Sequence, residues 1–272
     1  LRINAQDNDF IWHKELKSLP LLDIAIIATS SAPRFEIIKT LLKIGYDKFL
    51  LEKIVFQSEE QFKIVVELLK KSKSVAYCNF VNRYFNIYNT IKKELLNSKE
   101  QTNITIHGGE YGLACNAIHY IDIFQYLTGN NNILLKKSKI NISQSENRRG
   151  EIYKEFNGFI SFKNSKSDTI KLISEPNYTV GVTINIQNGD QNYLLNENTE
   201  MVYFNTPNDF NFDKFSIIPT SKLSKVIVED IFDDNCRLTK IEETYSAHVE
   251  LFNIFNIALY GESSIDTLCP IT

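Results

Sequence analysis

The sequence predicts an α/β chain in which a doubly wound parallel sheet is followed by an α+β region with a large, mostly antiparallel sheet. Two observations carry this prediction. Over the first hundred residues, short apolar runs alternate with segments whose apolar residues recur at helical spacing, as in βαβ crossovers. After residue 150, period-two runs follow one another without intervening helices, as in antiparallel sheets. The expected domains are residues 1–98 and 99–272.

Each element of the first domain has its own signal. The run "DIAIIA" predicts a strand, and "RFEIIKTLLKIG" predicts a helix that ends at Gly45. Ser58 and Gln61 occupy the N-cap and N3 places of a capping box at the start of the second helix. The predicted order is strand 23–28, helix 34–45, strand 48–51, helix 58–72, strand 74–78 and helix 83–96.

In the second domain, residues 103–129 predict a strand, a glycine-rich bend and an amphipathic helix that ends at Gly129. The clearest period-two run is formed by Val180, Val182, Ile184 and Ile186, and the "NGD" that follows it predicts a hairpin turn. Strands are expected at 156–162, 168–174 and 179–187, and helices near 221–232 and 242–260.

Composition excludes several classes of protein. The chain has 272 residues, 43% of them hydrophobic, and its net charge of −3 is not gathered into a block of one sign, which argues against a nucleic-acid partner. The longest apolar stretch, "PLLDIAIIA", is far shorter than the roughly 18 residues of a membrane span, and no signal peptide is visible. The four cysteines form no CxxC, so no metal site or disulfide framework is predicted, and a reduced cytoplasm is the expected location.

Polar residues follow the first three predicted strands. In an open parallel sheet the ligand lies outside the carboxyl ends of the strands, where the loops "TSSAPR", "EK" and "NFVNR" begin. This edge should be lined by Thr29, Ser30, Ser31, Glu52, Lys53, Asn79 and Arg83. A lysine that ends a strand among apolar neighbours loses hydration, which suits it to proton transfer. The alternative is that Glu52 and Lys53 form an ordinary surface pair at a helix entrance.

Other polar residues have simpler interpretations. A lone histidine is usually structural, and this is expected of His13, His107 and His248. His119 differs because it follows a glycine-rich bend that a substrate could approach closely. Cys115 is expected to be a small buried residue, and Asp122 is expected to be a helix cap or an ion-pair partner.

Several stretches resemble the Gfo/Idh/MocA oxidoreductases, the family of glucose-fructose oxidoreductase and inositol dehydrogenase. The segment "DIAIIATSSAPRFEIIKTLLKIGYDKFLLEK" is similar to the family's segment from an "ATPN" loop to an "EKP" motif. "NFVNRYFNIYNTIKK" resembles its "GFNRRF" stretch, and "GGEYGLACNAIHYIDIFQYLTG" its "GGGxxxDxGxHxxD" stretch. The resemblance covers roughly residues 20 to 129, and it implies a partial Rossmann-like dinucleotide-binding domain before a substrate-binding and oligomerisation domain.

The resemblance also implies roles for individual residues. Lys53 would be the general acid/base of hydride transfer to or from NAD or NADP, and His119 would assist it. The implied cofactor-binding residues are Thr29, Ser30, Ser31, Arg34, Glu52, Lys53, Asn79 and Arg83. The implied substrate-binding residues are Tyr84, Tyr111, Cys115, Asn116 and His119. The implied substrate is a sugar, cyclitol or nucleotide sugar, and the implied assembly is a homodimer or homotetramer through the carboxyl-terminal sheet.

The sequence also departs from the family pattern. Ile54 replaces the proline of EKP, and Cys115 stands where the family usually has an aspartate, although Asn116 could substitute for it by hydrogen bonding. No G-x-G-x-x-G occurs, so the chain is expected to be incomplete at its amino terminus and to bind NAD(H) weakly by itself. Two functions stay open: an NAD(P)-dependent oxidoreductase, and a non-catalytic relative that acts as a sugar-binding or assembly module.

Overall fold

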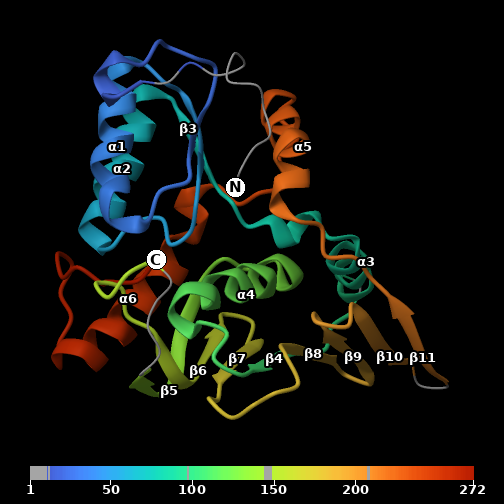
Figure 1. Cartoon of the computed structure of the whole chain (residues 1–272). Coiled ribbons are helices and arrows are strands. Elements are labelled where there is room, and N and C mark those ends of the chain that lie inside the picture. The colour runs from blue at the N-terminus through green and yellow to red at the C-terminus, as the bar shows by residue number, and fades with distance from the viewer. Residues whose placement is uncertain (1–10, 12, 97, 144–148, 207–208) are drawn as a thin grey trace.

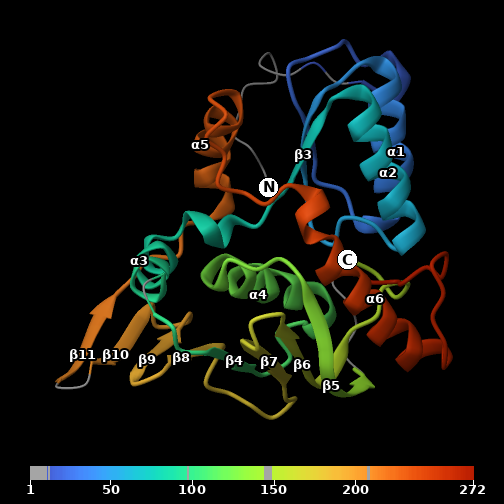
Figure 2. The same cartoon turned by 180° about the vertical axis from the view of Figure 1, so that it is seen from behind.

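The computed structural model describes residues 11, 13–96, 98–143, 149–206 and 209–272, which form a small parallel sheet and a large sheet (Figure 1). The small sheet has the order β1-β2-β3. Helices α1 and α2 cover one of its faces, and α5 stands on the opposite side (Figures 1 and 2). The elements are β1 (Ala25–Ile27), α1 (Ser31–Ile44), β2 (Lys48–Leu51), α2 (Glu59–Ser72), β3 (Val75–Cys78) and α5 (Thr220–Phe232).

The predicted alternation of strands and helices is confirmed, with differences at the helix ends. Helix α1 begins at Ser31, earlier than the apolar spacing predicts, and it ends at Gly45, whose φ of 112° requires a glycine. Ser58 caps α2 by accepting the N–H of Gln61 at 3.2 Å. The helix predicted at 83–96 is divided into a 3-10 turn, η3 (Val81–Tyr84), and α3 (Asn86–Leu95).

The large sheet is mostly antiparallel, as predicted, with β4 and β7 as its parallel pair. Its strand order is β11-β10-β9-β8-β4-β7-β6-β5. The strands are β4 (Thr102–Gly108), β5 (Ile133–Ile142), β6 (Phe156–Asn164), β7 (Thr169–Ser174), β8 (Thr183–Asn188), β9 (Gln191–Asn196), β10 (Met201–Thr206) and β11 (Asp209–Lys214).

The strand predicted at 179–187 is shorter than expected. β8 begins only at Thr183, and Val180 lies before it with 60% of its surface exposed. Ile184 and Ile186 are completely buried. The predicted hairpin turn is present at Gly189, with φ of 55° between β8 and β9.

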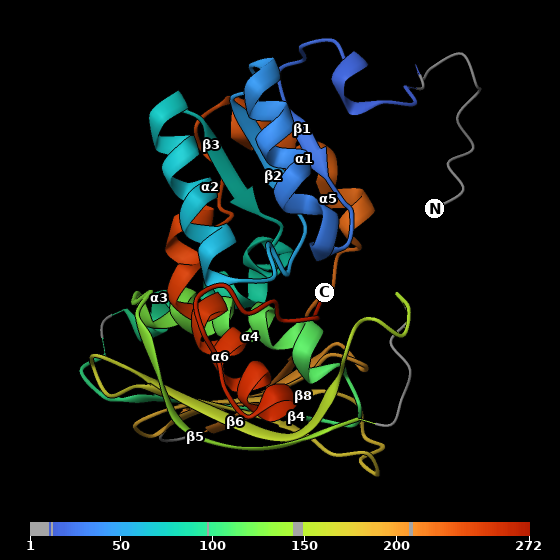
Figure 3. The same cartoon turned by 90° about the vertical axis from the view of Figure 1, so that its left-hand side faces the viewer.

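Helices α4 (Leu113–Thr128), α6 (Tyr245–Tyr260) and α3 lie on the face of the large sheet that is turned toward the small sheet (Figure 1). Ile104, Ile160 and Phe162 from the sheet and Phe124 from α4 are buried in the core of this layer. Helix α6 runs from the level of the small sheet down to the large one (Figure 3). The core is therefore continuous between the two sheets.

After β11 the chain returns to the small sheet. A short 3-10 turn, η4 (Ile241–Thr244), joins this returning segment to α6. Lys240 forms a β-bridge with Tyr77, and the N–H of Cys78 donates to the carbonyl of Thr239 at 2.9 Å. Residues after the second sheet therefore complete the carboxyl edge of the first. Among the described residues, no helix combines the length and the apolar character that crossing a membrane requires.

Candidate active site

The Lys53 side chain connects the end of β2 with the start of α4. Its ammonium Nζ donates to the carbonyl of Cys115 at 2.7 Å and to the amide oxygen of Asn116 at 3.0 Å. Only 8% of Lys53 is exposed, so it is not a surface residue that happens to precede a helix. Three of the predicted site residues, Lys53, Cys115 and Asn116, are therefore in contact. The sequence places Lys53 in the first expected domain and the other two in the second.

Asn116 is held so that its amide oxygen faces Lys53. Its Nδ2 donates to the carbonyl of Tyr111, and its backbone N–H donates to Gly112 at 2.8 Å. Gly112 has φ of 80°, a left-handed conformation that glycine adopts without strain. The glycine-rich bend before α4 therefore positions the acceptors of Lys53.

His119 lies one turn after Cys115 on α4 and is half-buried. Its ring packs edge-on against Phe80, with 5.6 Å between ring centroids. Burial, assisted by the positive charge of Lys53, lowers the pKa of His119 to about 3, so the imidazole is neutral at physiological pH. Its buried Nδ1 has no hydrogen-bond partner among the described residues.

Glu52 and Asn79 meet at the ends of β2 and β3. Asn79 Nδ2 donates to the carboxylate of Glu52 at 2.7 Å, and its backbone N–H donates to Leu51 at 2.8 Å. The buried Oδ1 of Asn79 and the buried hydroxyl of Thr29 at the end of β1 have no partner among the described residues. The predicted edge therefore holds buried polar atoms that a bound ligand could satisfy.

The other predicted residues of the first loop, Ser30 and Ser31, lie at the amino end of α1. Ser30 occupies the N-cap position of α1. Ser31 donates its N–H to the Thr272 hydroxyl at 2.9 Å and its own hydroxyl to the carbonyl of Ile271 at 2.6 Å. The amino end of α1 is thus covered by residues 271–272.

Arg34 is completely buried beneath this edge. Its guanidinium donates to the carbonyl of Thr29 after β1 and to those of Ile54 and Val55 after β2. Burial lowers its pKa to about 10. Arg34 therefore ties the first two strand-end loops together.

Arg83 forms a closed ion pair. Its Nε and Nη2 donate to the two carboxylate oxygens of Asp122 at 2.9 and 2.8 Å, and the Thr239 hydroxyl donates to the same carboxylate at 2.5 Å. The ion-pair interpretation of Asp122 is thus confirmed. Tyr84 joins a different group, because its hydroxyl donates to Asp230 of α5 at 2.7 Å.

The bend before α4 places Tyr111 and Cys115 close to Asn116. The buried Tyr111 hydroxyl has no partner among the described residues, and its ring contacts Tyr120 edge-on at 5.8 Å. Burial raises the pKa of the Cys115 thiol to about 11, which argues against a nucleophilic role.

Sequence analysis missed the acidic neighbours of this helix. Glu155, just before β6, accepts the N–H of Ala114 at 2.9 Å. Glu197, after β9, accepts the Tyr120 hydroxyl at 3.0 Å. Neither glutamate stands in a motif or next to a predicted site residue in the sequence, so only the fold reveals them.

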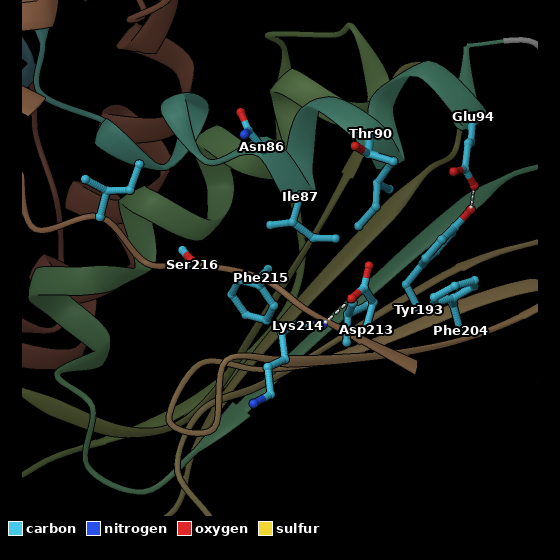
Figure 4. Close-up of a pocket in the computed structure, with 13 residues that line it drawn as sticks. Asn86, Ile87, Thr90, Glu94, Tyr193, Phe204, Asp213, Lys214, Phe215 and Ser216 are labelled. Carbon is cyan, nitrogen blue, oxygen red and sulfur yellow. Dashed lines mark hydrogen bonds between the residues drawn. The ribbon is translucent and has the colours of Figure 1, made fainter. Parts of the chain in front are cut away.

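A cavity of about 400 Å³ lies elsewhere, between α3 and strands β9 to β11 (Figure 4). Tyr193 donates to Glu94 across it, and Phe204 and Phe215 form part of its apolar wall. It includes none of the predicted site residues. Residues that the sequence predicts for the site lie in the Lys53 group and not in this cavity.

The fold is that of solved Gfo/Idh/MocA-type oxidoreductases, so the fold that the sequence resemblance implies is confirmed. No protein-family profile and no curated protein sequence matches the chain. The matches to solved structures have low sequence identity, so they show the fold alone.

Three such structures illustrate the range. An oxidoreductase from Agrobacterium radiobacter, in complex with NAD+, L-tartaric acid and magnesium, matches with a TM-score of 0.68 and 10% identity over 88% of this chain and 79% of that chain. UDP-N-acetylglucosamine 3-dehydrogenase from Acidithiobacillus ferrooxidans has a TM-score of 0.68 and 9% identity over 87% and 78%. A super-repressor mutant of Gal80p from Saccharomyces cerevisiae has a TM-score of 0.64 and 13% identity over 90% and 81%.

Proposed function

We propose that this protein is an NAD(P)-dependent oxidoreductase that transfers hydride between a nicotinamide cofactor and a sugar, cyclitol or nucleotide sugar. The observation that carries the proposal is the buried ammonium of Lys53 at the end of β2, beside His119. The Agrobacterium neighbour with NAD+ and the Acidithiobacillus dehydrogenase of a UDP-sugar support the cofactor and the substrate class.

Lys53 is suited to move a proton at the reacting oxygen. An ammonium has three hydrogen-bond donors, and Cys115 and Asn116 accept two of them. The third is left for the substrate hydroxyl or carbonyl oxygen. Lys53 would give its proton to that oxygen during reduction and take it back during oxidation.

His119 would hold the same oxygen. A neutral imidazole carries a donor on one nitrogen and an acceptor on the other, so it can bind a hydroxyl without adding charge. Its unpartnered Nδ1 means that no hydrogen bond from the described residues fixes the tautomer. The substrate would select the tautomer.

The strand-end residues fit a nicotinamide group. When bound, the cofactor supplies the hydride acceptor or donor. Its carboxamide has both donors and acceptors, which match the unpartnered Thr29 hydroxyl and Asn79 Oδ1. Glu52 would orient Asn79 through their 2.7 Å hydrogen bond.

The test is a turnover assay on the protein as its gene encodes it. NAD+ and NADP+ are offered separately with sugars, cyclitols and UDP-sugars, and the absorbance of the reduced nicotinamide is followed. We expect turnover with at least one pairing, with Lys53→Met inactive on it. Tight dinucleotide binding without turnover of any of these compounds would contradict the proposal.

A non-catalytic relative is the second candidate. It is favoured by the engagement of Ser31 with residues 271–272 and by the neighbour from Saccharomyces, which is a repressor. In that case a sugar should bind, as isothermal titration would detect, and Lys53→Met should change binding alone.

The outer face of the large sheet is proposed as the surface through which two copies associate. It exposes Leu194, Tyr203, Phe210 and Phe212, the last two at 68% and 67%. Ile184 and Ile186 of the predicted period-two run do not contribute to that face, because both are buried. Light scattering at tens of micromolar should show a dimer or tetramer, and Phe212→Asp should reduce it to a monomer.

A further inference from the structure

The first turn of α4 is held from two sides. Lys53 approaches it from β2 and binds the carbonyl of Cys115 and the side chain of Asn116. Glu155, just before β6, approaches it from another side, and its Oε2 accepts the N–H of Ala114 at 2.9 Å. Three consecutive residues therefore connect the lysine to a carboxylate from another part of the chain.

The glycine before this turn makes room for the carboxylate. A Cβ on Gly112 would lie 2.9 Å from the Cys115 sulfur and 3.3 Å from Glu155 Oε1. These distances are shorter than ordinary van der Waals contacts, so a larger residue would push the thiol and the carboxylate away. Gly112 therefore permits their close approach as well as the left-handed bend.

The charge of Lys53 needs a nearby partner. Both acceptors of its ammonium are uncharged oxygens, and no carboxylate among the described residues lies within 4.0 Å of it. A buried ammonium without a balancing charge is unfavourable. Burial raises the pKa of Glu155, while hydrogen bonds from Ala114 and Cys115 and the charge of Lys53 act against that rise. The charge of Lys53 therefore favours the charged form of Glu155.

We propose that Glu155 is a positioning residue for Lys53, which fixes the turn that holds the ammonium and balances its charge. The proposal rests on the proposed function only for the catalytic use of Lys53. This role of Glu155 differs from that of a simple helix cap, because a cap needs only a hydrogen-bond acceptor for the N–H of Ala114 and not a negative charge.

The reactivity of the Cys115 thiol depends on the charges of Glu155 and Lys53, and it can be measured without a substrate. Its thiol pKa, about 11, is raised first by burial and also by the charge of Glu155 and a hydrogen bond with it. Lys53 and Arg149 act in the opposite direction. Because the thiolate is the reactive form, the alkylation rate of Cys115 measures the charges around it.

The experiment compares iodoacetamide labelling of Cys115 at pH 8, followed by peptide mass spectrometry, in folded variants. Glu155→Gln keeps an acceptor for Ala114 but removes the charge, so labelling should become about 10-fold faster, the effect of one pKa unit. Lys53→Met should slow it. Glu197→Gln, which removes another buried carboxylate, is the matched control and should leave the rate unchanged.

A rate for Glu155→Gln equal to that of the Glu197→Gln control would overturn the proposal. If Glu155→Gln does not fold, the Lys53→Met/Glu155→Gln double variant decides, because removing both charges should restore folding. A double variant that also fails to fold would overturn it equally. Labelling needs no turnover, so its outcome is independent of whether the oxidoreductase assay succeeds.

Once a substrate is known, turnover can also distinguish the role of Glu155 as a helix cap from its role as a negative charge. Glu155→Gln should lower turnover. Cys115→Asp added to Glu155→Gln should recover turnover, because it returns a carboxylate to the same turn. No recovery in a folded double variant would contradict the charge role.

Discussion

Helix α4 carries two buried polar groups that differ in how completely they are satisfied. Around Asp122, the Arg83 guanidinium and the Thr239 hydroxyl occupy both carboxylate oxygens. Around His119, three residues earlier, Lys53 has only neutral acceptors and the imidazole Nδ1 has no partner among the described residues. A closed network stabilises the fold, whereas an open one leaves donors and acceptors for a ligand. This contrast supports a structural role for Asp122 and the catalytic roles that we propose for Lys53 and His119.

The largest effect on stability should come from disrupting the closed group of Arg83, Asp122 and Thr239. Asp122→Ala leaves the buried Arg83 without its counter-charge and should lower the free energy of unfolding by about 3–5 kcal/mol. Asp47→Ala removes the partner of Lys48 in an exposed pair at 3.7 Å and should cost at most about 1 kcal/mol. Urea denaturation measures both. An equal loss of unfolding free energy in the two variants would mean that the buried ion pair contributes no more to stability than the exposed one.

Substitution in the open group around Lys53 and His119 should affect turnover more than stability. Lys53→Met should leave dinucleotide binding nearly intact and lower turnover by about 100-fold, or about 2.7 kcal/mol in the barrier. Its effect on the melting temperature should be much smaller than that of Asp122→Ala. Lys48→Met, on the same strand but without contact to α4, is the control and should retain turnover. A Lys53→Met variant that melts early and turns over normally would reverse the assignment.

The buried His248 gives a second contrast with His119, through the pH dependence of stability. His248 on α6 is satisfied, with Nδ1 against the carbonyl of Thr244 at 3.0 Å and Nε2 accepting the N–H of Val55 at 3.2 Å. The structural role predicted for it is thus supported by both nitrogens. Burial lowers its pKa to about 4.

Because the folded protein favours neutral His248, its contribution to stability is complete above pH 6.5 and declines as the pH falls toward 4. Between pH 7 and pH 5 the loss should be about 2 kcal/mol. His248→Gln should show a shallower dependence in urea titrations at these two pH values. An unchanged slope would mean that His248 is protonated as easily in the folded state as in the unfolded chain.

The smallest effect is expected for His119→Ala. A neutral imidazole contributes orientation and a hydrogen bond but no charge, so turnover should fall by about 10-fold, or about 1.4 kcal/mol. The same variant should remain folded, since removing the ring leaves no hydrogen-bond partner unsatisfied at Nδ1. A loss of turnover larger than that of Lys53→Met would make His119 the principal proton-transfer residue.

Local patterns in the sequence predict the alternation of the small sheet and the strand-end position of Lys53, because periodicity and chain order determine both. They do not predict β5, whose lysines leave most of this edge strand exposed and without apolar alternation. Nor do they predict partners that fold in from remote segments, such as Glu155, Thr239 and Thr272. The site was predictable where it depends on strand order, and not where it depends on the packing of the second sheet.

The most direct test of the central claim, that Lys53 transfers the proton, is chemical rescue. Lys53→Ala would leave space at the end of β2 for a small primary amine such as ethylamine. Turnover of Lys53→Ala should be low without amine and should rise with ethylamine concentration, whereas His119→Ala should not respond. Near-normal turnover of Lys53→Ala without amine would contradict the claim, and so would low turnover that ethylamine raises equally in both variants.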